Sequence, residues 1–173
     1  GAIYASADIM ELRSTAGSKA LVYGATGAIG TANLQFLKYY GAHITAVCPG
    51  EHSELVRSLG ADKVIDYKTE DFTKDKERYD LVIDAVGKSS FLKCRKLLKK
   101  KGIYTSSNGF MNLFWALVTP IFGGKKVQFS GPKNIKEKLA FIRELIEKGA
   151  FRPVIDRVYP LEQIDEAFTY VGT

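Results

Sequence analysis

The glycine-rich segment Gly24–Gly30 (GATGAIG) constrains the fold of this chain more than any other feature. It follows the apolar run Lys19–Tyr23 and precedes apolar residues at helical spacing, Leu34, Leu37 and Tyr40. Strand, glycine turn and helix in this order are typical of dinucleotide sites, because glycine lets a pyrophosphate approach the backbone and the helix N-terminus offers it N–H groups. The candidate site residues in this segment are Ala25, Thr26, Gly27, Ala28, Ile29 and Gly30.

Strand-like and helix-like segments alternate along the rest of the chain. This alternation predicts an α/β fold, a Rossmann-type doubly wound parallel sheet with helices on both faces. We expect a short helix at 3–12 and, near the end of the chain, a last strand at 154–159 and a last helix at 161–170. The other expected strands are 20–23, 44–47, 63–66, 81–86, 103–106 and 127–129, and the other expected helices are 28–40, 51–59, 91–98 and 135–148.

Size, composition and charge are typical of one globular domain. The chain has 173 residues, of which 46% are hydrophobic and 25% charged, and its net charge is +6. The densest cationic cluster, 93–101, is not interleaved with aromatic residues, which favours a solvated helix end over a nucleic-acid surface. The longest apolar stretch, 110–124, contains Pro120 and is too short to span a bilayer. The expected partners therefore include neither nucleic acid nor membrane.

The cysteines and tyrosines limit the metal sites and the reactions that this chain can be expected to support. Cys48 and Cys94 form no CxxC pair, so we predict no metal site in this chain and a reducing, cytoplasmic location. Short-chain dehydrogenases also use a Gly-x-x-Gly-x-x-Gly turn, but they need a Tyr-x-x-x-Lys pair for proton transfer. None of the nine tyrosines has lysine four positions later, which disfavours that chemistry. No residue of the chain stands out as a catalytic proton donor.

Further motifs resemble the medium-chain dehydrogenase/reductase superfamily, and most closely its zinc-independent quinone-oxidoreductase branch. These motifs are GAHITAV at 41–47, LVRSLGAD at 55–62, VIDY at 64–67, YDLVIDAVG at 79–87, GIY at 102–104 and PVID at 153–156. The resemblance implies that 15–150 form the nucleotide-binding domain. It also implies that 1–14 and 151–173 pack toward an N-terminal catalytic domain absent from this chain, so we expect a fragment that is inactive on its own.

The resemblance also implies an activity. The intact parent would transfer hydride from a nicotinamide cofactor to a quinone, enone or carbonyl, with the small-molecule substrate bound together with the missing catalytic domain. The edge strand Lys125–Phe129 suggests a homodimer. Three alternatives stay open: a non-catalytic nicotinamide-nucleotide sensor, the cofactor domain of a zinc-dependent alcohol dehydrogenase, and a basic nucleic-acid or protein-interaction domain.

The end of the second strand bears on the choice between NADP(H) and NAD(H). A carboxylate usually holds the ribose hydroxyls there, and Cys48 takes its place. A carboxylate about 4 Å from a 2′-phosphate would cost about 4 kcal/mol at an effective dielectric constant of about 20. By resemblance, His52 and Tyr67 lie beside the 2′-phosphate, whereas Glu51 favours NAD(H). We predict NADP(H), with NAD(H) as the alternative.

The ends of two more strands complete the predicted pocket. Ligands of open parallel sheets lie beyond the carboxyl ends of the strands. This rule adds Ala85 and Val86 after the fourth strand and Ser106 and Ser107 after the fifth. Tyr23 is expected in the sheet core. The apolar patch around Trp115 is expected under the missing domain, near the substrate cleft or at a dimer contact.

Overall fold

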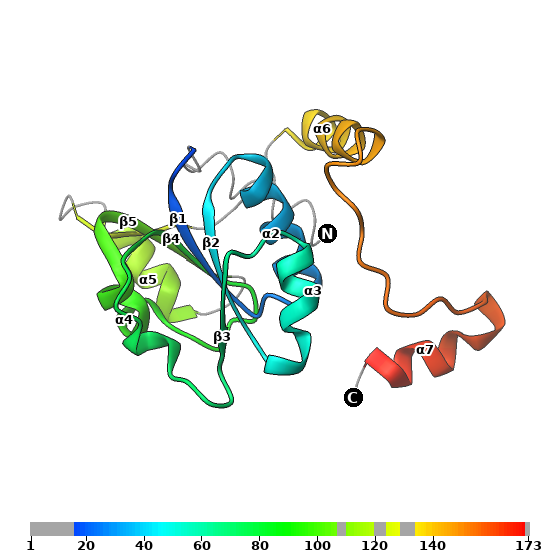
Figure 1. The fold of residues 1–173 in the computed structure, drawn as a ribbon, viewed down its shortest axis with the longest axis horizontal. Coiled ribbons are helices and arrows are strands. Elements are labelled where there is room, and N and C mark those ends of the chain that lie inside the picture. The colour runs from blue at the N-terminus through cyan, green and yellow to red at the C-terminus, as the bar shows by residue number, and fades with distance from the viewer. Residues whose placement is uncertain (1–15, 107–109, 120–123, 129–133, 172–173) are drawn as a thin grey trace.

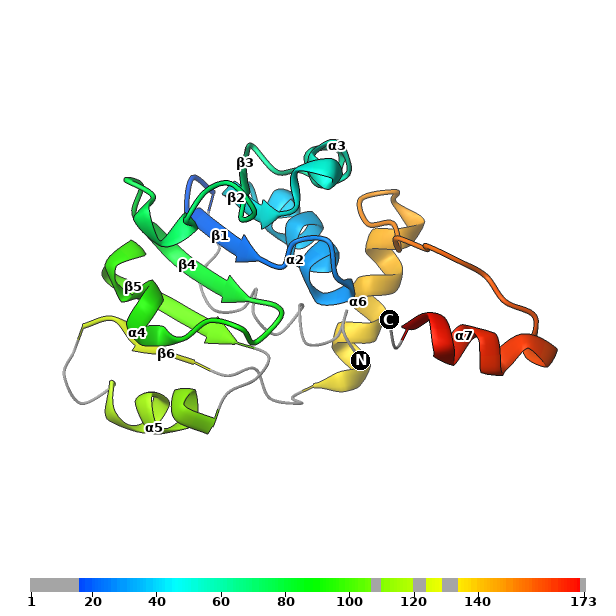
Figure 2. The ribbon, with the colours of Figure 1, turned by 90° about the horizontal axis from the view of Figure 1, so that it is seen from below.

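The computed structural model describes residues 16–106, 110–119, 124–128 and 134–171 (Figures 1 and 2). The helix expected at 3–12 lies outside these ranges. Six strands form one sheet: β1 (Lys19–Tyr23), β2 (His43–Cys48), β3 (Lys63–Asp66), β4 (Tyr79–Asp84), β5 (Leu98–Ser106) and β6 (Lys126–Val127). The helices are α2 (Ala28–Tyr39), α3 (Ser53–Ser58), α4 (Phe91–Cys94), α5 (Phe110–Val118), α6 (Ile135–Glu147) and α7 (Ile164–Val171).

The sheet has the doubly wound topology that the sequence predicts. Its strand order is β3-β2-β1-β4-β5-β6, and every neighbouring pair is parallel. The chain winds outward from β1 to β3, returns to lie beside β1 as β4, and winds outward again on the other side. The carboxyl ends of β1 and β4 therefore meet where the winding reverses, which is where open α/β sheets bind their ligands.

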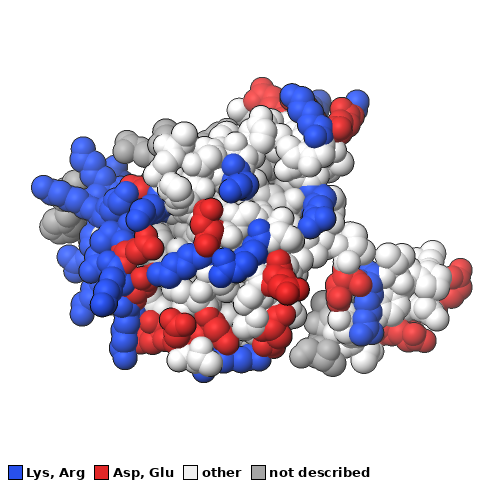
Figure 3. All heavy atoms as spheres, in the orientation of Figure 1, with Lys and Arg blue, Asp and Glu red and all other residues white. Residues whose placement is uncertain are grey.

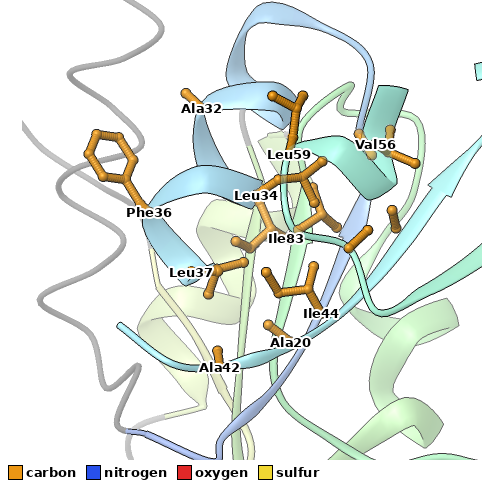
Figure 4. Packing of buried hydrophobic residues seen from close by; sticks show 14 of the residues in the cluster. Ala20, Ala32, Leu34, Phe36, Leu37, Ala42, Ile44, Val56, Leu59 and Ile83 are labelled. Atoms are coloured by element: carbon orange, nitrogen blue, oxygen red, sulfur yellow. The ribbon is translucent and has the colours of Figure 1, made fainter. Parts of the chain in front are cut away.

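Helices cover both faces of the sheet, as expected (Figure 2). Strand residues alternate between the two faces, so that Ala20 and Val22 join one core and Leu21 joins the other. Helices α2 and α3 pack on the first core, as Figure 4 shows, and α6 joins them there, whereas α4 and α5 pack on the second core. Each face is thus shielded from water, in keeping with the nearly continuous apolar runs of the strands.

Helix α2 is enclosed on nearly all sides. Every residue from Gly30 to Leu37 is buried, which suits a helix that lies between the sheet and its neighbours. The helix ends at Tyr39, and Gly41 follows with a φ of +75°. The Gly41 N–H donates to Lys38 O and the Ala42 N–H to Leu37 O. Gly41 therefore ends the helix as the sequence predicts, in the left-handed conformation that glycine favours.

Some predicted bounds differ from the structure. Strand β4 ends at Asp84 rather than at residue 86, because the Asp84 carboxylate accepts hydrogen bonds from the next turn. The helix expected at 91–98 splits into α4 and a 3-10 turn, Arg95–Leu97, and β5 begins at Leu98. The three lysines at 99–101 are typical of a loop, so the sequence does not indicate that the strand starts this early. The pairing of β4 with β5 is irregular beside these lysines.

The strand expected at 154–159 is wrong. This segment is extended but pairs with no described strand, and its apolar side chains stand in solvent: Ile155 is 68% exposed and Val158 is 85% exposed. Helix α7 follows a 3-10 turn, Leu161–Gln163, and buries none of its residues. In Figure 1 it stands apart from the sheet. The placement of 151–173 against a further domain stays a prediction, as do the other domain bounds.

Strand β6 lies at the edge of the sheet, where the sequence places an edge strand. It contains only Lys126 and Val127, and Phe129 lies outside the described residues. A homodimer through this edge stays a prediction.

Candidate functional site

The bend between β1 and α2 is held by the neighbouring strand. Gly24 has a φ of +77°, a left-handed conformation that favours glycine. The N–H groups of Gly24 and Ala25 both donate to Val47 O in β2, at 3.1 and 3.2 Å. These bonds turn the chain sharply as it leaves the sheet. Ala25 lies fully buried beneath the bend.

Two glycines of the bend are required by packing within the protein. A Cβ on Gly24 would lie 2.0 Å from Val86 Cγ2, and a Cβ on Gly30 would lie 2.1 Å from Gly24 O. Gly30 therefore brings α2 close against the bend, and Gly24 brings the bend close against the turn after β4. Gly30 has no room for a side chain because backbone atoms surround it, and at Gly24 the positive φ disfavours any side chain as well.

Gly27 differs from these two. Among the described residues, a Cβ built there would meet only Gly24 O at 3.7 Å, an ordinary contact, and its φ of −71° suits any residue. Nothing in the described protein requires glycine at this position. Gly27 instead lines a pocket. The structure thus keeps room for a group outside the chain.

Helix α2 begins directly after Gly27, which has no side chain to cap it. The first turn of α2 carries no acidic residue. Thr31 donates its N–H and its hydroxyl to Gly27 O, at 2.9 and 3.1 Å, so it secures the turn from within. The positive end of the helix dipole therefore faces the pocket without a carboxylate from its own first turn, an arrangement that favours an anion.

The turn after β4 forms a second side of the pocket and is organised by Asp84, which is only 1% exposed. Its Oδ1 accepts the N–H groups of Gly87 (2.7 Å) and Val86 (3.2 Å). Its Oδ2 accepts the N–H of Ser89 (2.7 Å) and the hydroxyl of Tyr104 (3.2 Å). Burial, and next the charge of Asp84, raises the pKa of Tyr104, so this hydroxyl stays a donor. Asp84 therefore fixes the turn that brings Val86 to the pocket.

These elements and the end of β2 enclose one pocket of about 630 Å³. It lies at the carboxyl ends of β1, β2 and β4, as the sheet topology leads us to expect. Its lining consists of Tyr23, Gly24, Thr26, Gly27, Ala28, Ile29, Cys48, Pro49, His52, Tyr67, Ala85, Val86 and Lys88.

The structure brings most of the predicted site residues to this pocket. Those that line it are Thr26, Gly27, Ala28, Ile29, Cys48, His52, Tyr67, Ala85 and Val86. Ala25 and Gly30 lie beneath the bend instead, and Ser106 is buried at the end of β5 beside Asp84. Ser107 lies outside the described residues.

Sequence reasoning missed Lys88 and Asp84, and it placed Tyr23 in the sheet core, where the ring does pack, without predicting that Tyr23 also lines the pocket. Tyr23 is half-buried and lines the pocket, where its ring stacks on Phe72 with centroids 4.8 Å apart and meets Tyr67 edge-on at 6.3 Å. An aspartate at the end of an otherwise apolar strand was a visible signal for Asp84. Lys88 carried no such signal, because only the Asp84 turn brings it to the pocket.

The charges near the end of β2 differ from what the sequence suggests. Glu51 does not line the pocket, and its carboxylate pairs with Lys68 at 2.8 Å. Each residue of this pair neutralises the other at the surface. Burial, followed by the nearby carboxylates of Asp66 and Glu51, raises the pKa of Cys48, so its thiol is neutral at neutral pH. Lys88 pairs with no acid among the described residues, which leaves the pocket lining with a cation and without a carboxylate.

Two searches of the described residues bear on metal and membrane binding. No group of three or more His, Cys, Asp or Glu side chains in these ranges is arranged to hold a metal ion. Within the same ranges, no helix has both the length and the apolar character needed to cross a membrane.

Known proteins similar to this chain are dehydrogenases and reductases. A family model described as zinc-binding dehydrogenase matches residues 59–173. The NAD(P)H oxidoreductase RTN4IP1, mitochondrial, of Mus musculus is 34% identical, over 90% of this chain and 45% of its own length. The NADPH-dependent alkenal/one oxidoreductase, chloroplastic, of Arabidopsis thaliana is 33% identical, over 92% of this chain and 39% of its own length.

Solved structures agree on the fold. The quinone oxidoreductase from Coxiella burnetii superposes with a TM-score of 0.82 at 20% identity, over 98% of this chain and 54% of its own. The chain spans less than half the length of the two curated relatives named above. Those relatives are described as mitochondrial and chloroplastic, so a cytoplasmic location stays a prediction.

Proposed function

Because the chain belongs to the zinc-binding dehydrogenase family of the medium-chain dehydrogenase/reductase superfamily, we propose that it binds NADP(H) as the cofactor domain of an oxidoreductase. The intact protein would transfer hydride to a quinone, an enone or a carbonyl compound. Relatives described as acting with NAD(P)H, on alkenals or on quinones support this proposal.

The observation that carries the proposal is the space over Gly27. A dinucleotide needs a place where its two phosphates approach the backbone at a helix N-terminus, and a Cβ on Gly27 would fill that place. The backbone at the start of α2, around Ala28, would approach the diphosphate, whereas the Gly27 N–H already donates to Gly24 O at 3.3 Å. The hydroxyl of Thr26, which bonds to no described residue, is available to the same group.

Other parts of the lining suit the rest of the cofactor. Val86 and Tyr23 offer apolar surface to the adenosine. Cys48 ends β2, where the ribose is held in this fold, and His52 in the next turn and Tyr67 directly after β3 line the same pocket. The cofactor supplies the hydride when it is bound. The described residues of this chain bind and orient it, and we assign none of them the transfer of a proton.

The preference for NADP(H) over NAD(H) rests on the charges at the end of β2. The carboxylate that would repel a 2′-phosphate is replaced by the neutral thiol of Cys48. Glu51, the one residue nearby that favoured NAD(H), is paired with Lys68 and does not line the pocket. His52 and Lys88 do line it and supply donors for a phosphate. These features together favour the phosphorylated cofactor.

Titration of the chain with NADPH and with NADH at one salt concentration tests both parts of the proposal. We expect NADPH to bind more tightly than NADH. Equal affinities, or tighter binding of NADH, would overturn the preference. A folded chain, shown by circular dichroism, that bound neither cofactor would overturn the proposed function itself.

A further inference from the structure

A second pocket, of about 460 Å³, lies away from the cofactor pocket and shares no residue with it. Its lining consists of Phe91, Arg95, Lys100, Trp115, Val118, Thr119, Gly124 and Lys125. Lys100 lies near the start of β5, and Lys125 directly precedes β6. Because all strands are parallel, this pocket lies near the amino ends of β5 and β6, on the face covered by α4 and α5.

The inner wall of this pocket is apolar and aromatic. The Phe91 and Trp115 rings pack with centroids 5.7 Å apart, and Trp115 rests on the core beneath this face of the sheet. Thr119 adds no free donor, because its hydroxyl donates to Trp115 O at 2.7 Å and accepts the Val127 N–H at 3.1 Å. A ligand that fills the inner part must therefore be largely apolar.

The rim of the pocket is cationic. Arg95, Lys100 and Lys125 line it, and none of them pairs with an acid among the described residues. The neighbouring Lys99, by contrast, is neutralised by Asp80 at 2.7 Å. The Lys125 ammonium donates to the backbone carbonyl of Arg95 at 2.6 Å, which holds Lys125 beside Arg95. Figure 3 shows the blue side chains crowded on the side of the molecule that carries β5 and α4.

The electrostatics indicate that this positive charge is uncompensated. Burial lowers the pKa of Lys125, and the charges of Arg95 and Arg78 lower it further. The electrostatic free energy of a cation held beside other cations falls when an anion binds next to it. The rim therefore favours a negatively charged group, whereas the wall favours hydrocarbon.

We infer that this pocket binds a small amphipathic anion, with an apolar chain or ring against Phe91, Trp115 and Val118 and a carboxylate or phosphate beside Arg95, Lys100 and Lys125. An inorganic anion would leave the apolar wall empty, and a neutral hydrocarbon would leave the cations unpaired. A pocket with an apolar lining and a few convergent charged groups is the usual form of a small-ligand site. The inference is independent of the proposed cofactor site.

The chain supplies its own probe, because Trp115 is its single tryptophan. Its fluorescence can be followed during titration with decanoate, with decanol and with decyltrimethylammonium, all below the concentrations at which they form micelles. We expect decanoate to change the emission at a concentration about tenfold lower than decanol, and decyltrimethylammonium to bind more weakly still.

Two sets of substitutions separate the pocket from the surrounding basic surface. The variant R95Q/K100Q/K125Q should bind decanoate about tenfold more weakly and decanol unchanged. The matched control K93Q/K96Q/K101Q removes the same charge from exposed lysines that do not line the pocket, and it should bind decanoate as the parent chain does. Circular dichroism confirms that both variants fold.

Four results would overturn the inference. Decanol could bind as tightly as decanoate, which would mean that the cations of the rim do not contribute to binding. The control variant could lose as much affinity for decanoate as the pocket variant, which would indicate diffuse surface charge. Trp115 emission could respond only to phosphatidylglycerol vesicles and not to free decanoate, which would indicate a membrane surface. The emission could also change on dilution without ligand, together with the sedimentation coefficient, which would indicate a contact between copies of the chain.

Discussion

The two pockets face opposite ends of one sheet and are built by different means. At the carboxyl ends, backbone forms much of the site: a glycine bend, the start of α2 and a turn held by Asp84. At the amino ends, the polar groups are the side chains of Arg95, Lys100 and Lys125. The difference follows from the direction of the chain. Helices of a parallel sheet begin near the strand ends, where their N–H groups attract anions, and they finish near the strand starts, where their carbonyl groups repel them.

The largest expected effect on stability concerns the glycine bend at the carboxyl ends of the strands. Gly30→Ala places a Cβ 2.1 Å from Gly24 O and 2.7 Å from the Ala25 backbone, none of which can move freely. We expect the free energy of unfolding to fall by about 3 kcal/mol or more. Urea denaturation followed by circular dichroism measures this loss. If Gly30→Ala were as stable as the parent chain, the close contact of α2 with the bend would be wrong.

Asp84→Asn comes next. The amide would set an NH₂ group against backbone N–H groups that now donate to the carboxylate. We expect a loss of about 2 kcal/mol in the free energy of unfolding, together with weaker NADPH binding. Asp71→Asn is the matched control, because Asp71 accepts the Thr73 N–H at an exposed turn where asparagine caps equally well. Equal stability of the two variants in urea would contradict the role assigned to Asp84.

Gly27→Ala sharpens the comparison, because it should alter binding without altering the fold. Within the described part of the chain, the added Cβ meets only Gly24 O at 3.7 Å, so we expect the stability to change by less than about 0.5 kcal/mol. The same Cβ occupies the proposed phosphate space, so NADPH affinity should fall about tenfold or more, which corresponds to about 1.4 kcal/mol. Titration of the variant measures this, and R95Q at the other pocket is the control that should bind NADPH normally. Unchanged affinity in Gly27→Ala would remove the main support for the proposed function.

The smallest expected effect concerns Lys88. Lys88 lines the cofactor pocket without an acidic partner among the described residues. Lys88→Gln should weaken NADPH binding about two- to fivefold, as expected for an exposed charge, and the loss should shrink at high salt. Lys93→Gln removes a charge that lies outside the pocket and should have no effect. Equal losses in the two variants would mean that only the net charge matters.

The sequence predicts the fold well because its signals are local. The glycine bend, the apolar strands and the glycine after α2 each define a structure within a few residues, and the structure confirms them. The segment 154–159 shows that local signals do not suffice to predict a strand. Its residues favour an extended chain, but a strand also needs a partner, and no described strand lies beside it.

The pockets were predictable only in part, for the same reason. Cys48 ends β2 and Gly27 lies in the bend after β1, so both residues can be identified from the strand ends that the sequence predicts. Lys88 reaches its place through the Asp84 turn, a set of hydrogen bonds that no pattern in the sequence reveals. The cations of the second pocket come from separate segments around β5 and β6, and only the folded sheet brings Lys125 beside Arg95.

The most direct test of the difference between the two ends is an NMR titration of the isotope-labelled chain with NADPH. We expect the largest changes of amide chemical shift at Gly24, Gly27, Ala28 and Ile29, with little change around Trp115 and Lys125. Largest changes around Trp115 and Lys125, with the bend unaffected, would contradict a cofactor site at the carboxyl ends of the sheet.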